Sequence, residues 1–386
     1  MNYFLRSAVL LIIAVSSYDT ALSQLNSFTT SRRAIRYNRV EGIHLGVEWK
    51  AFAAYDGRVR GTLSTGYGFK SEELTYAAKL NYRKSNFKGF EGNISYSHDI
   101  STNDAHLIGW LENSVSTLFA KEDYMDYFIS TGIHSELIYR KSRKYEIYSK
   151  YSVVKYESLR GHDVWSFSDL VGADKIFSSN PSVIEGTGSG LNLGFSYDSR
   201  INRFMITNSL TYSIEFEKTG GIFGGDFEYT GVKLNIRKYK RMFGPQMLVL
   251  RGFAGVRNGN GEEQFLFDIG GIGTLRGYDH KEFTGDKAFI LSADYMFKRT
   301  IFKRLPLKFL PFYPTMELIA FVDAGWTNLG EYTMPLNDPM SFDAGDVKYN
   351  IGIGYSFGRD MVRVNIAKRL DGVDGIKLTV RIFQRL

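Results

Sequence analysis

Apolar and polar residues alternate with a period of two along most of the chain. In Lys348 to Phe357 (KYNIGIGYSF), Tyr, Ile, Ile, Tyr and Phe share one face, and Lys, Asn, Gly, Gly and Ser share the other. The stretch Ile376 to Ile382 (IKLTVRI) repeats this pattern. A helix would spread these apolar residues around its axis, whereas successive side chains of a strand point to opposite faces. The pattern therefore predicts strands.

Fifteen strands are predicted after residue 41, centred near residues 45, 64, 78, 94, 133, 150, 194, 210, 232, 252, 292, 320, 353, 365 and 380. Their connections alternate between short turns and long segments, the latter at about 100–125, 158–187, 217–226, 258–286 and 327–346. In transmembrane barrels the long loops lie outside the cell and the short turns lie in the periplasm. This parity requires one more crossing before residue 41. We expect residues 24–40 to supply it as a weak first strand beside the last strand, which gives the even number of 16, or as a segment in the lumen.

The two faces of the predicted strands differ in chemistry. Aromatic residues such as Trp49, Tyr82 and Tyr355 lie on the apolar face near strand ends, where amphipathic rings settle among lipid headgroups. The opposite face carries charges such as Arg251 and Arg363. A soluble β-sandwich could use the same alternation, but more than a dozen long strands with only 7 prolines favour a membrane barrel. The predicted fold class is all-β, a transmembrane antiparallel β-barrel.

Residues 1–23 have the features of a secretory signal peptide. Arg6 is the early positive charge, Ser7 to Ser17 (SAVLLIIAVSS) is the apolar region, and Ala21-Leu22-Ser23 is a small-x-small cleavage site. The apolar run is too short to span a bilayer. We expect residues 24–386 to form the exported barrel, integral to the outer membrane of a Gram-negative bacterium.

Composition narrows the function classes. The 386 residues include no Cys, which excludes a disulfide scaffold, a zinc finger and a thiol nucleophile. The 6 His residues show no metal-ligand spacing. The loop Gly161 to Ser166 holds His, Asp and Ser but lacks the Gly-x-Ser-x-Gly elbow of hydrolases. We therefore expect no enzymatic activity, no catalytic residue, no metal or cofactor, and no nucleic-acid partner.

The long connection 258–286 is unusually apolar for an exposed loop, because it contains the run FLFDIGGIGTLRGY. If it folds into the lumen, Arg276 needs a carboxylate partner once it leaves water. Asp323 and Glu317 lie opposite the apolar positions of one following strand, and Asp294 does so on another. These three carboxylates are the candidate partners, and the alternative is a loop arginine in solvent.

Two motifs resemble those of the BamA/TamA bacterial surface antigen family, which includes outer-membrane insertases and two-partner secretion pores. The lumen-loop motif of that family is similar to Gly270, Gly271, Leu275, Arg276, Gly277 and Tyr278. Its second signature, a strand whose Asp holds the loop arginine, is similar to Phe321 to Gly325 (FVDAG), and Tyr197 to Arg200 (YDSR) is similar to a weaker third feature. The resemblance extends from about residue 190 to 386. It implies a loop folded into the lumen and locked by Arg276 and Asp323.

The resemblance also implies a role in inserting or translocating proteins at the outer membrane. The barrel would thin the bilayer and open a seam between its first and last strands. Family members usually carry periplasmic POTRA domains, for which residues 24–41 leave no room, so a member without them is expected. The alternative is a passive pore or scaffold barrel whose basic lumen prefers anions. Expected partners are outer-membrane lipid and other outer-membrane or periplasmic assembly proteins; the client and the oligomeric state stay open.

Overall fold

The computed structural model describes residues 34–85, 88–170, 172, 175–200, 208–259, 262–298, 316–329, 344–357, 362–373 and 375–382. The expected signal peptide, residues 24–33 of the expected first segment and most of the 327–346 connection lie outside these ranges. None of the described helices is long and apolar enough to cross a membrane.

Within the described residues, sixteen strands form one sheet in which neighbours follow chain order, with β14 directly after β11. They are β1 (Ile35–Asn38), β2 (Gly42–Ala54), β3 (Val59–Gly68), β4 (Glu73–Arg83), β5 (Gly89–Ser101), β6 (Phe128–Arg140), β7 (Tyr145–Ser158), β8 (Gly186–Asp198), β9 (Ser209–Thr219), β10 (Tyr229–Arg241), β11 (Met247–Gly259), β14 (Lys287–Lys298), β15 (Glu317–Asn328), β16 (Lys348–Phe357), β17 (Val362–Arg369) and β18 (Ile376–Ile382). A separate ribbon pairs β12 (Phe267–Ile269) with β13 (Phe283–Gly285). The sheet confirms the predicted fold class, and each of the fifteen predicted centres falls within a strand.

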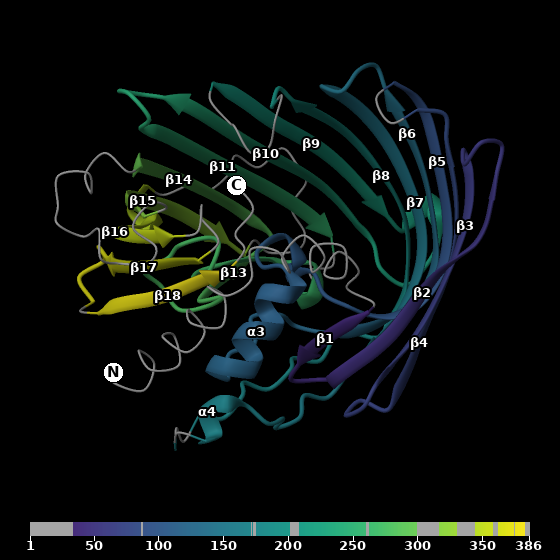
Figure 1. Ribbon diagram of the computed structural model, residues 1–386, viewed down its shortest axis with the longest axis horizontal. Coiled ribbons are helices and arrows are strands. Elements are labelled where there is room, and N and C mark those ends of the chain that lie inside the picture. Colours follow the sequence, from purple (N-terminus) through teal and green to yellow (C-terminus); the bar gives the residue numbers. More distant parts are fainter. Residues whose placement is uncertain are drawn as a thin grey trace. The chain divides into compact units, whose positions relative to one another are not determined.

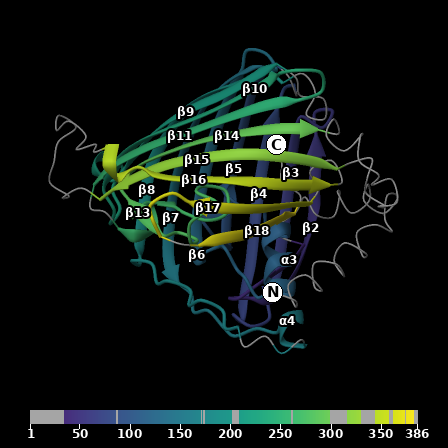
Figure 2. The ribbon, with the colours of Figure 1, turned by 90° about the vertical axis from the view of Figure 1, so that its left-hand side faces the viewer.

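The chain divides into two compact units, which are described separately. Unit 1 comprises residues 1–82, 93–134 and 154–186, and unit 2 comprises residues 83–92, 135–153 and 187–386. The described part of unit 1 also holds two α-helices, α3 (Trp110–Ala120) and α4 (Phe167–Leu170). In unit 2, strands β14 to β18 lie side by side in chain order (Figure 2).

Burial in unit 2 is the reverse of that in a soluble protein. On β16 the side chain of Ile351 is 54% exposed, whereas that of its neighbour Asn350 is fully buried. On β15 Val322 is 43% exposed, whereas Asp323 is fully buried. An extended apolar surface is rarely left to water and is typical of a lipid-facing sheet. The buried polar face therefore corresponds to the lumen side of a barrel.

Residues 35–38 of the 24–40 segment form the expected weak strand, β1, which pairs with β2 in the register Arg36↔His44. The backbone N–H of Tyr37 donates to Ser114 Oγ of α3 at 2.9 Å. The helix, which lies beside β1 in Figure 1, thus occupies part of the strand edge that we had assigned to the last strand.

The helix α3 lies in the 100–125 connection, where the sequence predicted only a loop. Its buried residues are Glu112, Asn113 and Thr117, so its inward face is polar. A helix is recognised in sequence by an apolar stripe with a period of 3.6, which this helix lacks on its buried face. Lys121 ends it in the left-handed conformation, with φ of 54°.

The strand bounds preserve the predicted sidedness of unit 1. A four-residue turn connects β2 to β3, whereas residues 102–127 and 159–185, which parity places on the opposite side, form long connections. We retain the parity assignment for unit 1, which puts residues 159–185 outside the cell and the turn at 55–58 in the periplasm.

Thiol labelling tests this sidedness. Ser179 is exposed in the 159–185 connection, and Arg58 is exposed in the turn between β2 and β3. We expect Ser179→Cys to react with an impermeant thiol reagent on intact cells, and Arg58→Cys to react only after the outer membrane is opened. Since the chain has no native Cys, the unsubstituted protein is the blank. The opposite labelling pattern would reverse the topology.

Candidate functional site

The connection between β11 and β14 is a folded element of unit 2. The β12–β13 ribbon forms its base, and Ile269, Leu275 and Tyr278 are buried together with Ala288 of β14. Gly270 has φ of 121°, and a Cβ there would lie 2.4 Å from a backbone oxygen, so only glycine fits. The apolar residues of this loop are therefore buried against the polar face of the sheet and not exposed to water.

Close approach of the loop to the wall also depends on Gly277. A Cβ at this position would lie 2.7 Å from the Cβ of Asn350 and 3.1 Å from the backbone N of Arg369. Next to it, the Tyr278 hydroxyl donates to the carbonyl of Tyr349 at 3.1 Å. The glycine thus brings the loop backbone against β16 and β17. It also places Arg276, the preceding residue, next to the sheet.

Arg276 bonds to carboxylates of two adjacent strands. Its Nε and Nη2 donate to Asp323 at 2.8 and 2.6 Å, and Nη2 also donates to Asp294 at 2.7 Å. The side chains are 9%, 0% and 2% exposed, respectively. Because Ser292 of β14 pairs with Asp323, Asp294 two positions further along points to the same face. The guanidinium also lies 3.6 Å from the ring centroid of Phe321.

Burial alone would lower the pKa of Arg276, but Asp323 and Asp294 outweigh it and raise the pKa above its ordinary value. The loop arginine is therefore a permanent cation. A charge held this way is costly to leave unpaired, so the two carboxylates fix the position of the loop tip.

Further wall residues complete the cluster. Arg251 and Arg363 each donate to Asp294 Oδ2 at 3.1 Å, and Asn350 donates to Asp323 Oδ2 at 2.8 Å. The sequence showed Arg251 and Arg363 only as charges on the polar face, and Asn350 only as an inward position of its strand. Their bonds to Asp294 and Asp323 depend on pairing register, which no sequence motif records.

The structure brings together most of the residues selected from the sequence. Asp323 and Asp294 contact Arg276, and the residues Gly270, Gly271, Leu275, Gly277 and Tyr278 build the loop around it. Of the two further neighbours that the sequence offered, Asp294 and Glu317, Arg276 bonds to Asp294. Glu317 lies on the same face of β15 as Asp323, but it is six positions away, which is about 20 Å along the strand.

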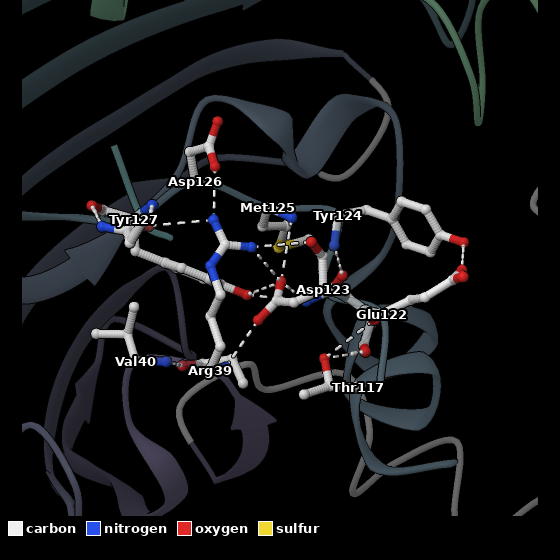
Figure 3. Close-up of polar contacts among 12 residues, drawn as sticks. Arg39, Val40, Thr117, Glu122, Asp123, Tyr124, Met125, Asp126 and Tyr127 are labelled. Atoms are coloured by element: carbon white, nitrogen blue, oxygen red, sulfur yellow. Dashed lines mark hydrogen bonds and ion pairs between the residues drawn. The ribbon is translucent and has the colours of Figure 1, made fainter. Parts of the chain in front are cut away.

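Unit 1 holds a second buried polar cluster, at the turn between β1 and β2 (Figure 3). The backbone N–H of Arg39 donates to Asp123 Oδ2 at 2.8 Å, and its Nη2 donates to Asp126 at 2.6 Å. Asp123 Oδ1 also accepts from Asn113 of α3 at 2.8 Å and from the hydroxyl of Tyr127 at 2.9 Å. The cluster attaches the turn to α3 and to the segment that follows it. Sequence reasoning missed it because none of its residues belongs to a motif.

Glu41 is the carboxylate at the centre of the same turn. It is fully buried and accepts from Arg36 at 2.6 and 2.7 Å and from Asn38 at 2.6 Å, while His44 Nδ1 lies 2.9 Å away. Burial favours the protonated form, but the contacts with His44 and Arg36 prevail and lower the pKa of Glu41 to about 2. The bonded carboxylate therefore stabilises the turn only while it is ionised.

Among the described residues no group of three or more His, Asp or Glu side chains could hold a metal ion. Asp294, Asp323, Asp123 and Glu41 are each bonded to arginine or amide groups. These bonds can hold a loop or a turn in place.

Comparisons with known proteins agree with this fold. The family of unknown function DUF5686 matches through its C-terminal domain over residues 14–244, more than half of the chain. No curated protein matches the sequence. The structure is similar to that of BamA from Haemophilus ducreyi lacking POTRA domains 1-3, with 15% identity, 89% of this chain and 67% of that chain covered, and a TM-score of 0.57. At this identity the likeness shows the fold alone.

Two further solved structures are CdiB proteins. CdiB from Acinetobacter baumannii is 12% identical over 88% of this chain and 56% of that chain, with a TM-score of 0.44. CdiB from Escherichia coli is 13% identical over 90% of this chain and 60% of that chain, also with a TM-score of 0.44. The chain thus spans between 56% and 67% of the lengths of these proteins.

A double-mutant cycle tests the loop lock. Arg276→Ala and Asp323→Ala should each destabilise the protein by about 3–5 kcal/mol, because each leaves a buried charge without its partner. The double variant should be no less stable than the worse single variant. Resistance to heat in detergent and protease access to the loop measure both effects.

The matched control pairs Arg276→Ala with Glu317→Ala, which changes a carboxylate on the same strand and face but about 20 Å away. Those two effects should simply add. If the effects of Arg276→Ala and Asp323→Ala also add, the residues do not interact and the lock does not exist.

Acid unfolding tests Glu41. Its pKa is about 2 in the folded protein, against an ordinary value of 4.5, so the unfolded chain binds the proton first. The resulting stability, roughly 3 kcal/mol, is present above pH 4.5 and is lost as pH falls towards 2. Glu41→Gln should be less stable at pH 7 and should lose less stability between pH 5 and 3. The exposed Glu72→Gln should follow the unsubstituted protein, and an unchanged slope in Glu41→Gln would contradict the assignment.

Proposed function

The chain belongs to the family of unknown function DUF5686, and for this member we propose the role of an outer-membrane barrel of the BamA/TamA type, one that assists the insertion or translocation of proteins. We further propose that it resides in the outer membrane and works with other outer-membrane or periplasmic assembly proteins. No bond is made or broken in this role. Its chemistry consists of backbone pairing, lipid contact and the positioning of the loop.

The observation that carries the proposal is the bonding of Arg276 to Asp323 and Asp294 inside unit 2. It is the arrangement that the resemblance to the BamA/TamA family implies. A loop fixed by charge to β14 and β15 keeps those strands rigid, while strands outside the cluster remain free to move.

Strand length supports the same proposal. In unit 2, β10 and β11 have 13 residues each, but β17 has 8 and β18 has 7. At about 3.4 Å per residue, β18 extends roughly 24 Å, less than the ~30 Å hydrocarbon core of a bilayer. A short strand at an end of the sheet order thins the adjacent lipid and lies where an incoming strand can pair with the sheet.

The two ends of the sheet order differ in accessibility. The N–H of Tyr37 on β1 is already bonded to Ser114 of α3, which occupies part of that strand's edge in unit 1. We therefore assign the first contact with a client strand to β18 and not to β1. Pairing of this kind is β-augmentation, in which main-chain hydrogen bonds supply the affinity.

Reconstitution into liposomes tests the function. An unfolded outer-membrane barrel added as client should fold faster in vesicles that contain the protein than in empty vesicles, as measured by protease protection. Arg276→Ala should lose most of this acceleration at a temperature where it remains folded, and Arg58→Gln, an exposed change in a turn, should keep it.

Two outcomes would contradict the proposal. Unchanged client folding together with steady anion-selective conductance would reject the proposal and establish the passive pore. Full activity of Arg276→Ala would separate insertion from the loop lock and remove the observation on which the proposal rests.

A further inference from the structure

A small pocket lies in unit 2 between the loop tip and the wall. Three arginines line it, Arg251 of β11, Arg276 of the loop and Arg381 of β18, and the described part of its lining includes no carboxylate. The hydroxyl groups of Thr274, Ser292 and Thr379 and the side-chain amide of Asn365 complete the polar lining. Guanidinium groups only donate hydrogen bonds, and hydroxyl and amide groups can donate them, so the pocket is rich in donors and its charged groups are all positive.

Two carboxylates outside the pocket lining bond to its arginines. Asp323 accepts from Arg276 with both oxygens and from Asn350 with one. Asp294 accepts from Arg276, Arg251 and Arg363. Two carboxylates thus serve three arginines, whose guanidinium groups carry five N–H donors each. The contacts with Asp294 leave donors of Arg251 to face the pocket.

Pairing register adds further positive charge to the same face. Arg363 of β17 lies directly opposite Arg381 of β18. Both residues are buried, with exposed fractions of 1% and 7%.

We propose that this pocket binds a small inorganic anion of the size and charge of chloride, held by Arg251, Arg276 and Arg381. The cavity volume is about 10 Å³, room for a single occupant of about the size of a water molecule, so only a monatomic ion and not an organic ligand suits it. The bound anion joins the loop tip to β18, a strand for which no bond to Asp323 or Asp294 is described. The site goes beyond the insertion role and does not depend on it.

Anion exchange tests the site. The purified protein should resist heat better in sodium chloride than in sodium gluconate at equal ionic strength, because gluconate is too large for the pocket. The midpoint should rise by roughly 2 °C for each tenfold increase of chloride above the dissociation constant. Crystals grown in bromide should show anomalous density between the three arginines.

Two variants and one control make the assignment specific. Arg381→Gln should lose the chloride dependence, and Thr379→Asp, which supplies a carboxylate within the pocket, should be stable without chloride. Arg58→Gln, an exposed arginine of unit 1, should keep the full dependence. If Arg381→Gln does not fold, Thr379→Asp and the bromide density decide the question. Equal stability in chloride and gluconate, full chloride dependence in Thr379→Asp, or bromide bound only elsewhere would each overturn the site.

Discussion

A buried arginine with two buried carboxylates is the interaction on which unit 2 depends. The loop between β11 and β14 has little regular structure of its own beyond the three-residue strands β12 and β13. Its apolar side chains need cover, and they obtain it only while Arg276 holds the tip against β14 and β15. Since a lone buried charge costs several kcal/mol, the folded loop and the sheet register stabilise each other.

The sheet was predictable from the sequence because a membrane imposes a simple code on it. Strands that face lipid on one side and water or protein on the other must alternate, and aromatic residues mark their ends. Ile351 and Asn350 follow that code as neighbours with opposite burial. The same alternation identified Asp323, Asp294 and Glu317 as inward carboxylates. It gives the face of the strand on which a side chain lies, but not its position along the strand. Register alone places Asp323 beside Arg276 and Glu317 far from it.

The polar cluster of unit 1 could not be predicted for a different reason. Arg39, Asn113 and Asp123 come from a turn, a helix and a loop, and each is an ordinary polar residue in its own segment. Their contacts arise only when three connections meet. A pattern with a period of two or 3.6 reports what one element buries, and it does not report which polar groups of different elements will share a hydrogen bond.

The polar inward face of α3 has a consequence for the order of folding. An isolated helix of eleven residues is marginal in water, and this one has few buried apolar side chains to stabilise it. Its Asn113 and Ser114 bond to groups of neighbouring segments, including the backbone of β1. The helix therefore cannot nucleate the chain around it. It forms late, once the β1–β2 hairpin presents its polar groups, and its melting should report the loss of that hairpin.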